Sequence, residues 1–222
     1  MEKRFGNNNP DINDYVETLF HPEDKILKEA REQTKKGGLP LIQVGPMDAR
    51  HLEVITRALG AKKAVEVGTL GGYSGISILR GLSSNGKLYS FEINPKAVEI
   101  AQFSFNKAGF SGKYEIILGP AKEKLKDIEK EGPFDLVFLD ADKGGYPTYF
   151  KWAEKNLRVG GVVLADNVFA WGKISEKIKK GDPDLEDVIA LQKFNEEVSQ
   201  NSNFRTTILP TGEGLLMAVK IH

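Results

Sequence analysis

The sequence predicts an α/β protein in which a mostly parallel sheet carries helices on both faces and ends in an antiparallel hairpin. Three observations support this prediction. The chain has 222 residues, 40% of them hydrophobic, which suffices for one domain with a sizeable core. Short β-rich runs alternate with helical stretches, and the C-terminal end offers two strand-like runs joined by a turn. We therefore predict a single domain over 1–222, with N-terminal helices in 1–60 and an α/β core in 61–222.

The N-terminal part is predicted to be helical. Residues 13–36 carry apolar side chains at mixed spacings of three and four, with Pro22 suited to a helix start, and they predict two helices that end at the glycines that follow. A third helix is predicted over 47–59, because its apolar residues share one face and Gly60 follows as a stop signal.

The remaining elements follow from β-rich runs and turn signals. Near-continuous apolar runs that alternate with helices indicate a parallel sheet covered on both faces. These runs lie at 64–68, 87–92, 114–118, 135–140 and 161–166. The last stretch, 203–221, has two strand-like runs around Pro-Thr-Gly-Glu-Gly, which predicts the closing hairpin.

The amino-acid composition indicates which kinds of binding partner to expect. Thirty-one basic and thirty-one acidic residues leave a formal charge of zero, so the overall charge favours a small-molecule partner over nucleic acid or anionic lipid. The absence of cysteine excludes disulfides, thiolate metal ligands and a cysteine nucleophile, and it fits a reducing compartment. No segment reaches the ~18 apolar residues of a membrane span. We expect no membrane partner and a cytoplasmic location.

Polar residues gather where the predicted strands end, and in an open parallel sheet this edge binds ligands. The first loop, VEVGTLGGYSG, is rich in glycine but lacks the G-x-G-x-x-G spacing of dinucleotide folds. Glu66 would repel a phosphate and attract the amino group or sulfonium of S-adenosylmethionine. Glu92 ends the second strand, where a carboxylate can accept both ribose hydroxyls. Packing alone would also explain the glycine loop, but Glu92 favours cofactor binding.

Oxygen donors follow two later strands. Asp140, Asp166 and Asn167 offer hard oxygen ligands, and none of the three histidines lies in either stretch, so Mg²⁺, Mn²⁺ or Ca²⁺ is favoured over zinc. Three protein ligands leave positions for water and for two adjacent substrate oxygens, which fits a vicinal diol such as a catechol. A phenol with a pKa near ~10 needs activation at neutral pH. Lys143 is the candidate cation or base for this step.

A family resemblance rests on these motifs. The chain resembles the cation-dependent class I O-methyltransferases, the group of catechol and caffeoyl-coenzyme A O-methyltransferases, in VEVGTLGGYS, FEINP, LGPA, DLVFLDADKGGY and GGVVLADNV. The similarity runs over nearly the whole chain, to the hairpin LPTGEGLLMAVK. It implies a seven-stranded Rossmann-like methyltransferase sheet and, commonly, a homodimer.

The resemblance also implies roles for individual residues. Mg²⁺ would be held by Asp140, Asp166 and Asn167, and Lys143 would be the catalytic base beside Asp140. The S-adenosylmethionine site would be lined by Val44, Glu66, Gly68, Ser74, Glu92, Ala121 and Asp142. One departure concerns the acceptor pocket, because Ala170 stands where many plant-type members have tryptophan, and the tryptophan here is Trp171.

Alternatives remain open at this point. Some bacterial relatives methylate a hydroxylated uridine in tRNA, and the four lysines in 173–180 would suit phosphate contacts, although a solvated loop explains them as well. A non-catalytic nucleotide-binding module or an NAD-dependent dehydrogenase is disfavoured by the missing G-x-G-x-x-G. Among the aromatic residues, we expect Tyr149, Phe150 and Trp152 to pack against the sheet or a dimer partner, whereas Tyr146 is placed near the rim, where contact with substrate is open to it.

Overall fold

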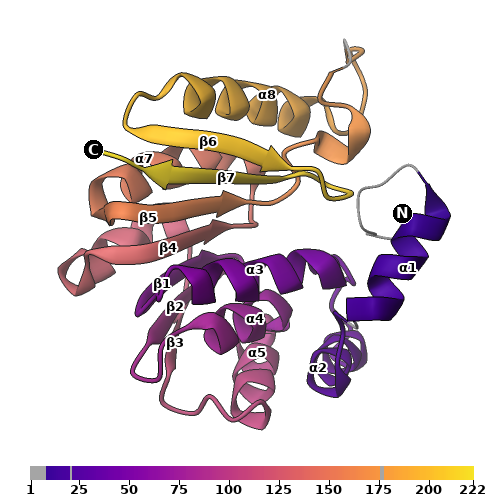
Figure 1. The fold of residues 1–222 in the computed structure, drawn as a ribbon, viewed down its shortest axis with the longest axis vertical. Coiled ribbons are helices and arrows are strands. Elements are labelled where there is room, and N and C mark those ends of the chain that lie inside the picture. The colour runs from indigo at the N-terminus through magenta and orange to yellow at the C-terminus, as the bar shows by residue number, and fades with distance from the viewer. Residues whose placement is uncertain (1–8, 21, 176–177) are drawn as a thin grey trace.

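The computed structural model describes residues 9–20, 22–175 and 178–222 (Figure 1). Its seven-stranded sheet has the order β3-β2-β1-β4-β5-β7-β6. The strands are β1 (Lys63–Val67), β2 (Lys87–Glu92), β3 (Tyr114–Leu118), β4 (Phe134–Leu139), β5 (Leu157–Ala165), β6 (Phe204–Leu209) and β7 (Leu215–Lys220). The helices are α1 (Pro10–Phe20), α2 (Lys25–Lys36), α3 (Pro46–Ala58), α4 (Tyr73–Gly81), α5 (Pro95–Lys107), α6 (Ala121–Lys124), α7 (Tyr146–Asn156) and α8 (Leu185–Gln200). Short 3₁₀ turns are η1 (Leu125–Glu131), η2 (Lys143–Gly145) and η3 (Ala170–Gly172).

The strand pairing confirms the predicted fold class. Strands β1 to β5 pair in parallel, and β7 runs antiparallel to both β5 and β6. The chain builds β1, β2 and β3 outward on one side and then returns to place β4 on the other side of β1. The strand order therefore reverses between β1 and β4, which is the point where open α/β sheets bind ligands.

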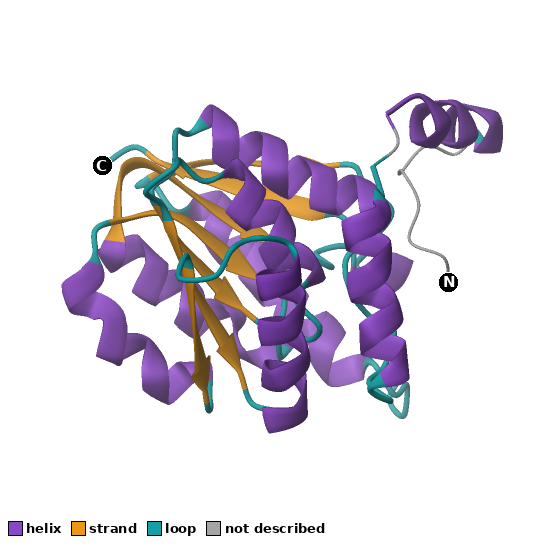
Figure 2. Cartoon of the chain, turned by 90° about the horizontal axis from the view of Figure 1, so that it is seen from below, coloured by secondary structure: helices purple, strands orange, loops and turns teal. Residues whose placement is uncertain are grey.

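Alternation along each central strand explains its continuous hydrophobicity. In β4, Leu136 and Phe138 pack in the core on the side of α2 to α5, whereas Val137 and Leu139 pack in the core on the side of α7 and α8. Each of these side chains is fully buried. Figure 2 shows the helices on both sides of the sheet. A strand buried on both faces has no polar face, so it appears in the sequence as an unbroken apolar run.

Several boundaries differ from the predictions. Helix α2 begins at Lys25 because the Asp24 side chain accepts a hydrogen bond from the backbone N–H of Leu27, so Pro22 lies before the helix and does not start it. Helix α3 begins at Pro46, one residue earlier than predicted. Strand β5 begins at Leu157, well before the predicted residue 161, and its pairing with β4 is irregular near its start. A bulged strand start carries no clear period in the sequence.

Helix α1 lies apart from the sheet (Figures 1 and 2), and Asn13 is its buried residue. Its side chains Ile12, Tyr15, Leu19 and Phe20 are each more than 40% exposed. Among the residues described, no helix is both long and apolar enough to cross a bilayer.

Candidate active site

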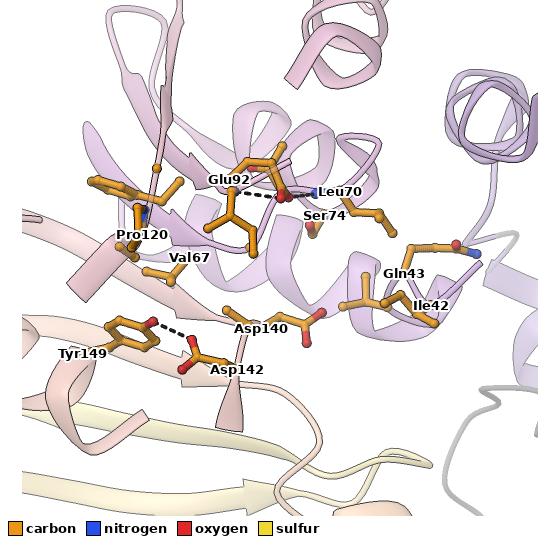
Figure 3. Close-up of a pocket in the computed structure, with 18 of the residues that line it drawn as sticks. Ile42, Gln43, Val67, Leu70, Ser74, Glu92, Pro120, Asp140, Asp142 and Tyr149 are labelled. Carbon is orange, nitrogen blue, oxygen red and sulfur yellow. Dashed lines mark hydrogen bonds between the residues drawn. The ribbon is translucent and has the colours of Figure 1, made fainter. Parts of the chain in front are cut away.

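A cavity of about 470 Å³ opens at the carboxyl ends of β1, β2 and β4, beside the reversal of strand order (Figure 3). Most residues predicted for cofactor binding line this cavity together with Asp140. They are Val44, Gly68, Ser74, Glu92, Ala121 and Asp142. The backbone hydrogen bonds between neighbouring strands continue for one residue beyond β4 and β5. Asp140 N–H donates to Val67 O (2.9 Å), and Asp166 N–H donates to Leu139 O (3.0 Å). The sheet thereby fixes the backbone positions of Asp140 and Asp166, the first polar residues after β4 and β5.

The glycine loop 68–75 forms one wall. Gly68 has a φ of +96°, and a Cβ at this position would collide with the backbone carbonyl of Asp140, so only glycine fits where the ends of β1 and β4 approach. Leu70 also has a left-handed φ, +48°. Such a conformation is strained for a residue with a side chain and persists where surrounding contacts fix it.

Glu92 provides one of these contacts. Its Oε2 accepts a hydrogen bond from Leu70 N–H (2.8 Å), and its Oε1 accepts from the N–H groups of Ile93 (2.8 Å) and Asn94 (2.9 Å). Figure 3 shows this carboxylate directed toward the glycine loop. Three backbone donors thus fix the orientation of a carboxylate on the cavity wall, where the ribose acceptor was predicted.

Glu66, predicted to line the cofactor site, instead lies beneath it. It is fully buried and is not among the lining residues. Its carboxyl group accepts hydrogen bonds from the hydroxyls of Ser74 (2.6 Å), Thr69 (2.7 Å) and Ser90. Burial raises the pKa of Glu66, against the opposing effect of these hydroxyls. Its contact with the cavity therefore passes through Ser74 and Thr69, which do line it.

Asp142 is held on the opposite side of the cavity. The Tyr149 hydroxyl donates to its Oδ1 (2.6 Å), and Lys122 forms an ion pair with its Oδ2 (2.8 Å). Figure 3 shows the tyrosine directed at this carboxylate. A Cβ at Gly145 would lie 2.7 Å from Asp142 Oδ2, so the glycine leaves room for the pair. Burial, and then Asp142, raise the pKa of Tyr149, which keeps its hydroxyl a donor.

Lys143 connects the two polar loops. Its Nζ donates to Asp140 Oδ1 (3.2 Å), Asn167 Oδ1 (2.7 Å) and the Tyr146 hydroxyl (2.7 Å). Only 7% of Lys143 is exposed. Tyr146 is fully buried, and its hydroxyl lies 3.1 Å from the backbone oxygens of Leu139 and Asp166. The expected position of Tyr146 near the rim, open to substrate, is therefore wrong, because this residue supports Lys143 from within the core.

The predicted metal ligands are partly brought together. Asp140 and Asn167 place carboxylate and amide oxygens within 3.2 Å of the same Nζ, so these two side chains converge on one point. Asp166 is fully buried and adjoins Asn167, whose φ is +64°. Within residues 9–20, 22–175 and 178–222, no group of three or more His, Cys, Asp or Glu forms that could hold a metal. Two carboxylates and one amide oxygen nevertheless fit the preference of a hard dication.

Other residues of the site were not predicted. Ile42, Gln43, Tyr73 and Lys122 line the cavity, and Tyr149, predicted to pack against the sheet, lines it as well. Sequence offered a signal only for Tyr73, which lies within the glycine loop.

The hairpin tip between β6 and β7 makes a contact with the loop after β5 that was not predicted. Thr211 and Glu213 are 3% and 5% exposed, and Phe169 N–H donates to Glu213 O (3.0 Å), beside the loop of Asn167. The sequence showed only a turn, so nothing in it linked the tip to the residues after β5.

The sheet order, the glycine-rich first loop and the carboxylate that ends β2 define a class I methyltransferase. The family model for O-methyltransferases matches residues 17–221. The chain therefore belongs to the O-methyltransferase family, and the predicted class of S-adenosylmethionine-dependent enzyme is confirmed.

Individual relatives agree with this assignment. The chain is 34% identical to a catechol O-methyltransferase of Niastella koreensis, over 89% of each chain. It is 31% identical to a catechol O-methyltransferase of Mycobacterium tuberculosis, over 92% of this chain and 90% of the relative. An O-methyltransferase of Bacillus cereus, solved with S-adenosylhomocysteine, superposes with a TM-score of 0.85 at 32% identity, over 94% of this chain and 96% of that one.

Proposed function

We propose that the protein transfers a methyl group from S-adenosylmethionine to a hydroxyl of a catechol-like small molecule, with the help of a divalent metal ion. The observation that carries the proposal is that Lys143 joins Asn167 to Asp140, and that Asp140 lines the cavity. The names of the two catechol O-methyltransferases among its relatives support the acceptor class.

The cofactor would occupy the cavity between the glycine loop and Asp142. Glu92 would accept the ribose hydroxyls with the capacity left by its three backbone donors. Gly68, Ser74 and Ala121 line this cavity, and their apolar and hydrogen-bonding groups suit an adenosine with a charged amino acid tail.

The metal would be held by Asp140, Asp166 and Asn167, and when bound it would favour ionisation of the acceptor hydroxyl. Lys143 lies next to two of these residues. An ammonium group has three N–H donors, and all three are used here. To take a proton from the acceptor, Lys143 must first lose a proton and release one of these contacts; if it stays charged, it stabilises the anionic oxygen.

The test is methyl transfer to a panel of catechols, flavonoids and hydroxylated or unmodified tRNA, with Mg²⁺ and with chelator. We expect transfer to catechols that stops in chelator and returns with Mg²⁺. Asp166→Ala should abolish transfer while S-adenosylhomocysteine still binds, as measured by calorimetry. Full activity in chelator, or unchanged turnover of Asp166→Ala, would exclude the metal assignment.

The alternative acceptor, a hydroxylated uridine in tRNA, has less support. Lys173 is held by Asp182 (2.9 Å) and Asp184 (2.7 Å), so its charge is already compensated. Lys177 lies outside the described residues. The net charge of zero also lacks the excess of basic residues that phosphate binding favours. A nucleotide-binding module and an NAD-dependent dehydrogenase are further disfavoured by the family assignment.

A further inference from the structure

Tyr73, a residue of the cavity wall, forms a hydrogen bond with Glu23, which lies fifty positions earlier in the sequence. Tyr73 begins α4, is 2% exposed and lines the cavity. Its hydroxyl donates to Glu23 Oε1 (3.0 Å), which precedes α2 and is not a lining residue. Burial and the neighbouring Glu23 raise the pKa of Tyr73, so the hydroxyl keeps its proton.

Glu23 is itself held rigidly. Arg31 binds it in a two-point arrangement, with Nε donating to Oε1 (2.8 Å) and Nη2 donating to Oε2 (2.8 Å). Burial acts to raise the pKa of Glu23, but the hydrogen bonds from Arg31 and Tyr73 outweigh it, so this pKa is lowered. A two-point contact fixes the orientation of the carboxylate as well as its position.

Two more contacts join α2 to the cofactor loop and its helix. Asp24, the N-cap of α2, forms an ion pair with Arg80 of α4 (2.7 Å). Thr34 packs directly against Gly71, where an added Cβ would collide with the threonine side chain. Helix α2 and the two residues before it therefore contact the glycine loop at Gly71, and α4 both at its start and near its end.

We propose that α2 is a positioning element for the cofactor loop and that it acts mainly through Glu23 and Tyr73. The loop contains the left-handed Leu70, and a strained backbone holds its shape only where several contacts fix it. Glu92 fixes the loop from the sheet, and Glu23, just before α2, fixes it from outside. The inference rests on the proposed cofactor cavity and extends it to a residue that does not touch the cofactor.

The test uses Tyr73→Phe, Glu23→Gln and the double variant of the full chain. Matched controls are Tyr114→Phe, whose hydroxyl binds Asn106 (3.0 Å), and Glu115→Gln, whose partner is Lys87 (2.8 Å). Neither control residue lines the cavity. The measurements are the Kd for S-adenosylhomocysteine by calorimetry, KM and kcat for S-adenosylmethionine, and Tm to confirm folding.

We expect each single variant to raise the Kd and the KM by about three- to tenfold, with kcat changed less than twofold and the controls unchanged. The double variant should bind S-adenosylhomocysteine about as tightly as the single variant with the higher Kd, because both substitutions act on the same contact between Tyr73 and Glu23. An unchanged Kd in both Tyr73→Phe and Glu23→Gln would overturn this inference but not the proposed function. If the unmodified protein does not bind S-adenosylhomocysteine, the proposed function fails as well.

Discussion

At the scale of single residues, Lys143 bears most directly on the proposed chemistry. It is almost buried, and all its donors are engaged by Asp140, Asn167 and Tyr146. The long side chain of Lys143 is held by one residue after β4, Asp140, and one after β5, Asn167. In the proposed mechanism, the same geometry would serve a base or an electrostatic stabiliser.

Replacing Lys143 should separate catalysis from cofactor binding. We expect Lys143→Met to lower kcat by roughly 10²- to 10⁴-fold, because the general base or the stabilising charge is lost. The Kd for S-adenosylhomocysteine should change less than about twofold, since Lys143 is not a lining residue. Lys87→Met, at an exposed ion pair, serves as the control. A large change in Kd with kcat preserved would make Lys143 a binding residue.

Gly68 allows a second test at this scale. Gly68→Ala combines a left-handed φ of +96° with a collision against Asp140, so it should destabilise the fold by ~2–4 kcal/mol. Gly109 has a similar φ of +86° but no neighbouring atom within 4 Å of an added Cβ, so Gly109→Ala should cost only about 1 kcal/mol. Urea denaturation measures both values. Equal losses would show that the close approach to Asp140 is unimportant.

At the scale of elements, the buried strands and their carboxyl ends could be predicted from sequence, because hydrophobic runs and the polar residues after them are local signals. Strand β2 was predicted over 87–92 and is observed there. The start of β5 and the direction of the Glu66 side chain could not be predicted. Both depend on which neighbours lie across the sheet, and the hydroxyls around Glu66 come from separate positions of the chain.

Asp135 lies near the amino end of β4, where it binds residues at the starts of β1 and β5. Burial acts to raise its pKa, but hydrogen bonds from Arg158 and from the backbone N–H groups of Lys62 and Lys63 outweigh this effect and lower it. A carboxyl group with a lowered pKa in the folded state stabilises the protein above its unfolded pKa of ~3.9, and this contribution is lost as the pH falls through the folded value.

Asp135→Asn should therefore lower the free energy of unfolding at pH 7 by on the order of 2 kcal/mol. The difference from the unmodified protein should shrink as the pH falls below ~3.9, where Asp135 itself becomes protonated on unfolding. Urea denaturation at pH 7 and at pH 3 measures the change. A difference that does not depend on pH would mean that shape, and not charge, is what Asp135 contributes.

At the scale of the whole molecule, the homodimer remains a prediction. The exposed apolar side chains Ile12, Tyr15 and Leu19 of α1 are spaced by three and four residues, and Phe20 adjoins Leu19; such a surface suits contact with a second copy. We expect light scattering to give the mass of a dimer for the unmodified protein. The variant Leu19→Ser with Phe20→Ser should be monomeric, whereas Val159→Ser, an exposed apolar site elsewhere, should not change the mass. A monomeric unmodified protein would end the prediction.

Sequence could not predict the contacts that cross the molecule. Glu23 and Tyr73 lie fifty positions apart, and nothing local to either residue signals the other. The hairpin tip at Glu213 and the loop of Asn167 are likewise joined only by folding. The family motifs gave the site because each motif lies at the end of one strand.

The three amides bound to Glu92 have a consequence for how the protein and its ligand share free energy. The carboxylate is immobilised when the chain folds, so the entropic cost of aligning it is met before any nucleoside arrives. In the proposed complex, folding stability and cofactor affinity would both depend on this one side chain. Replacing Glu92 would therefore lower both properties, and a gain in either has to be sought at other positions.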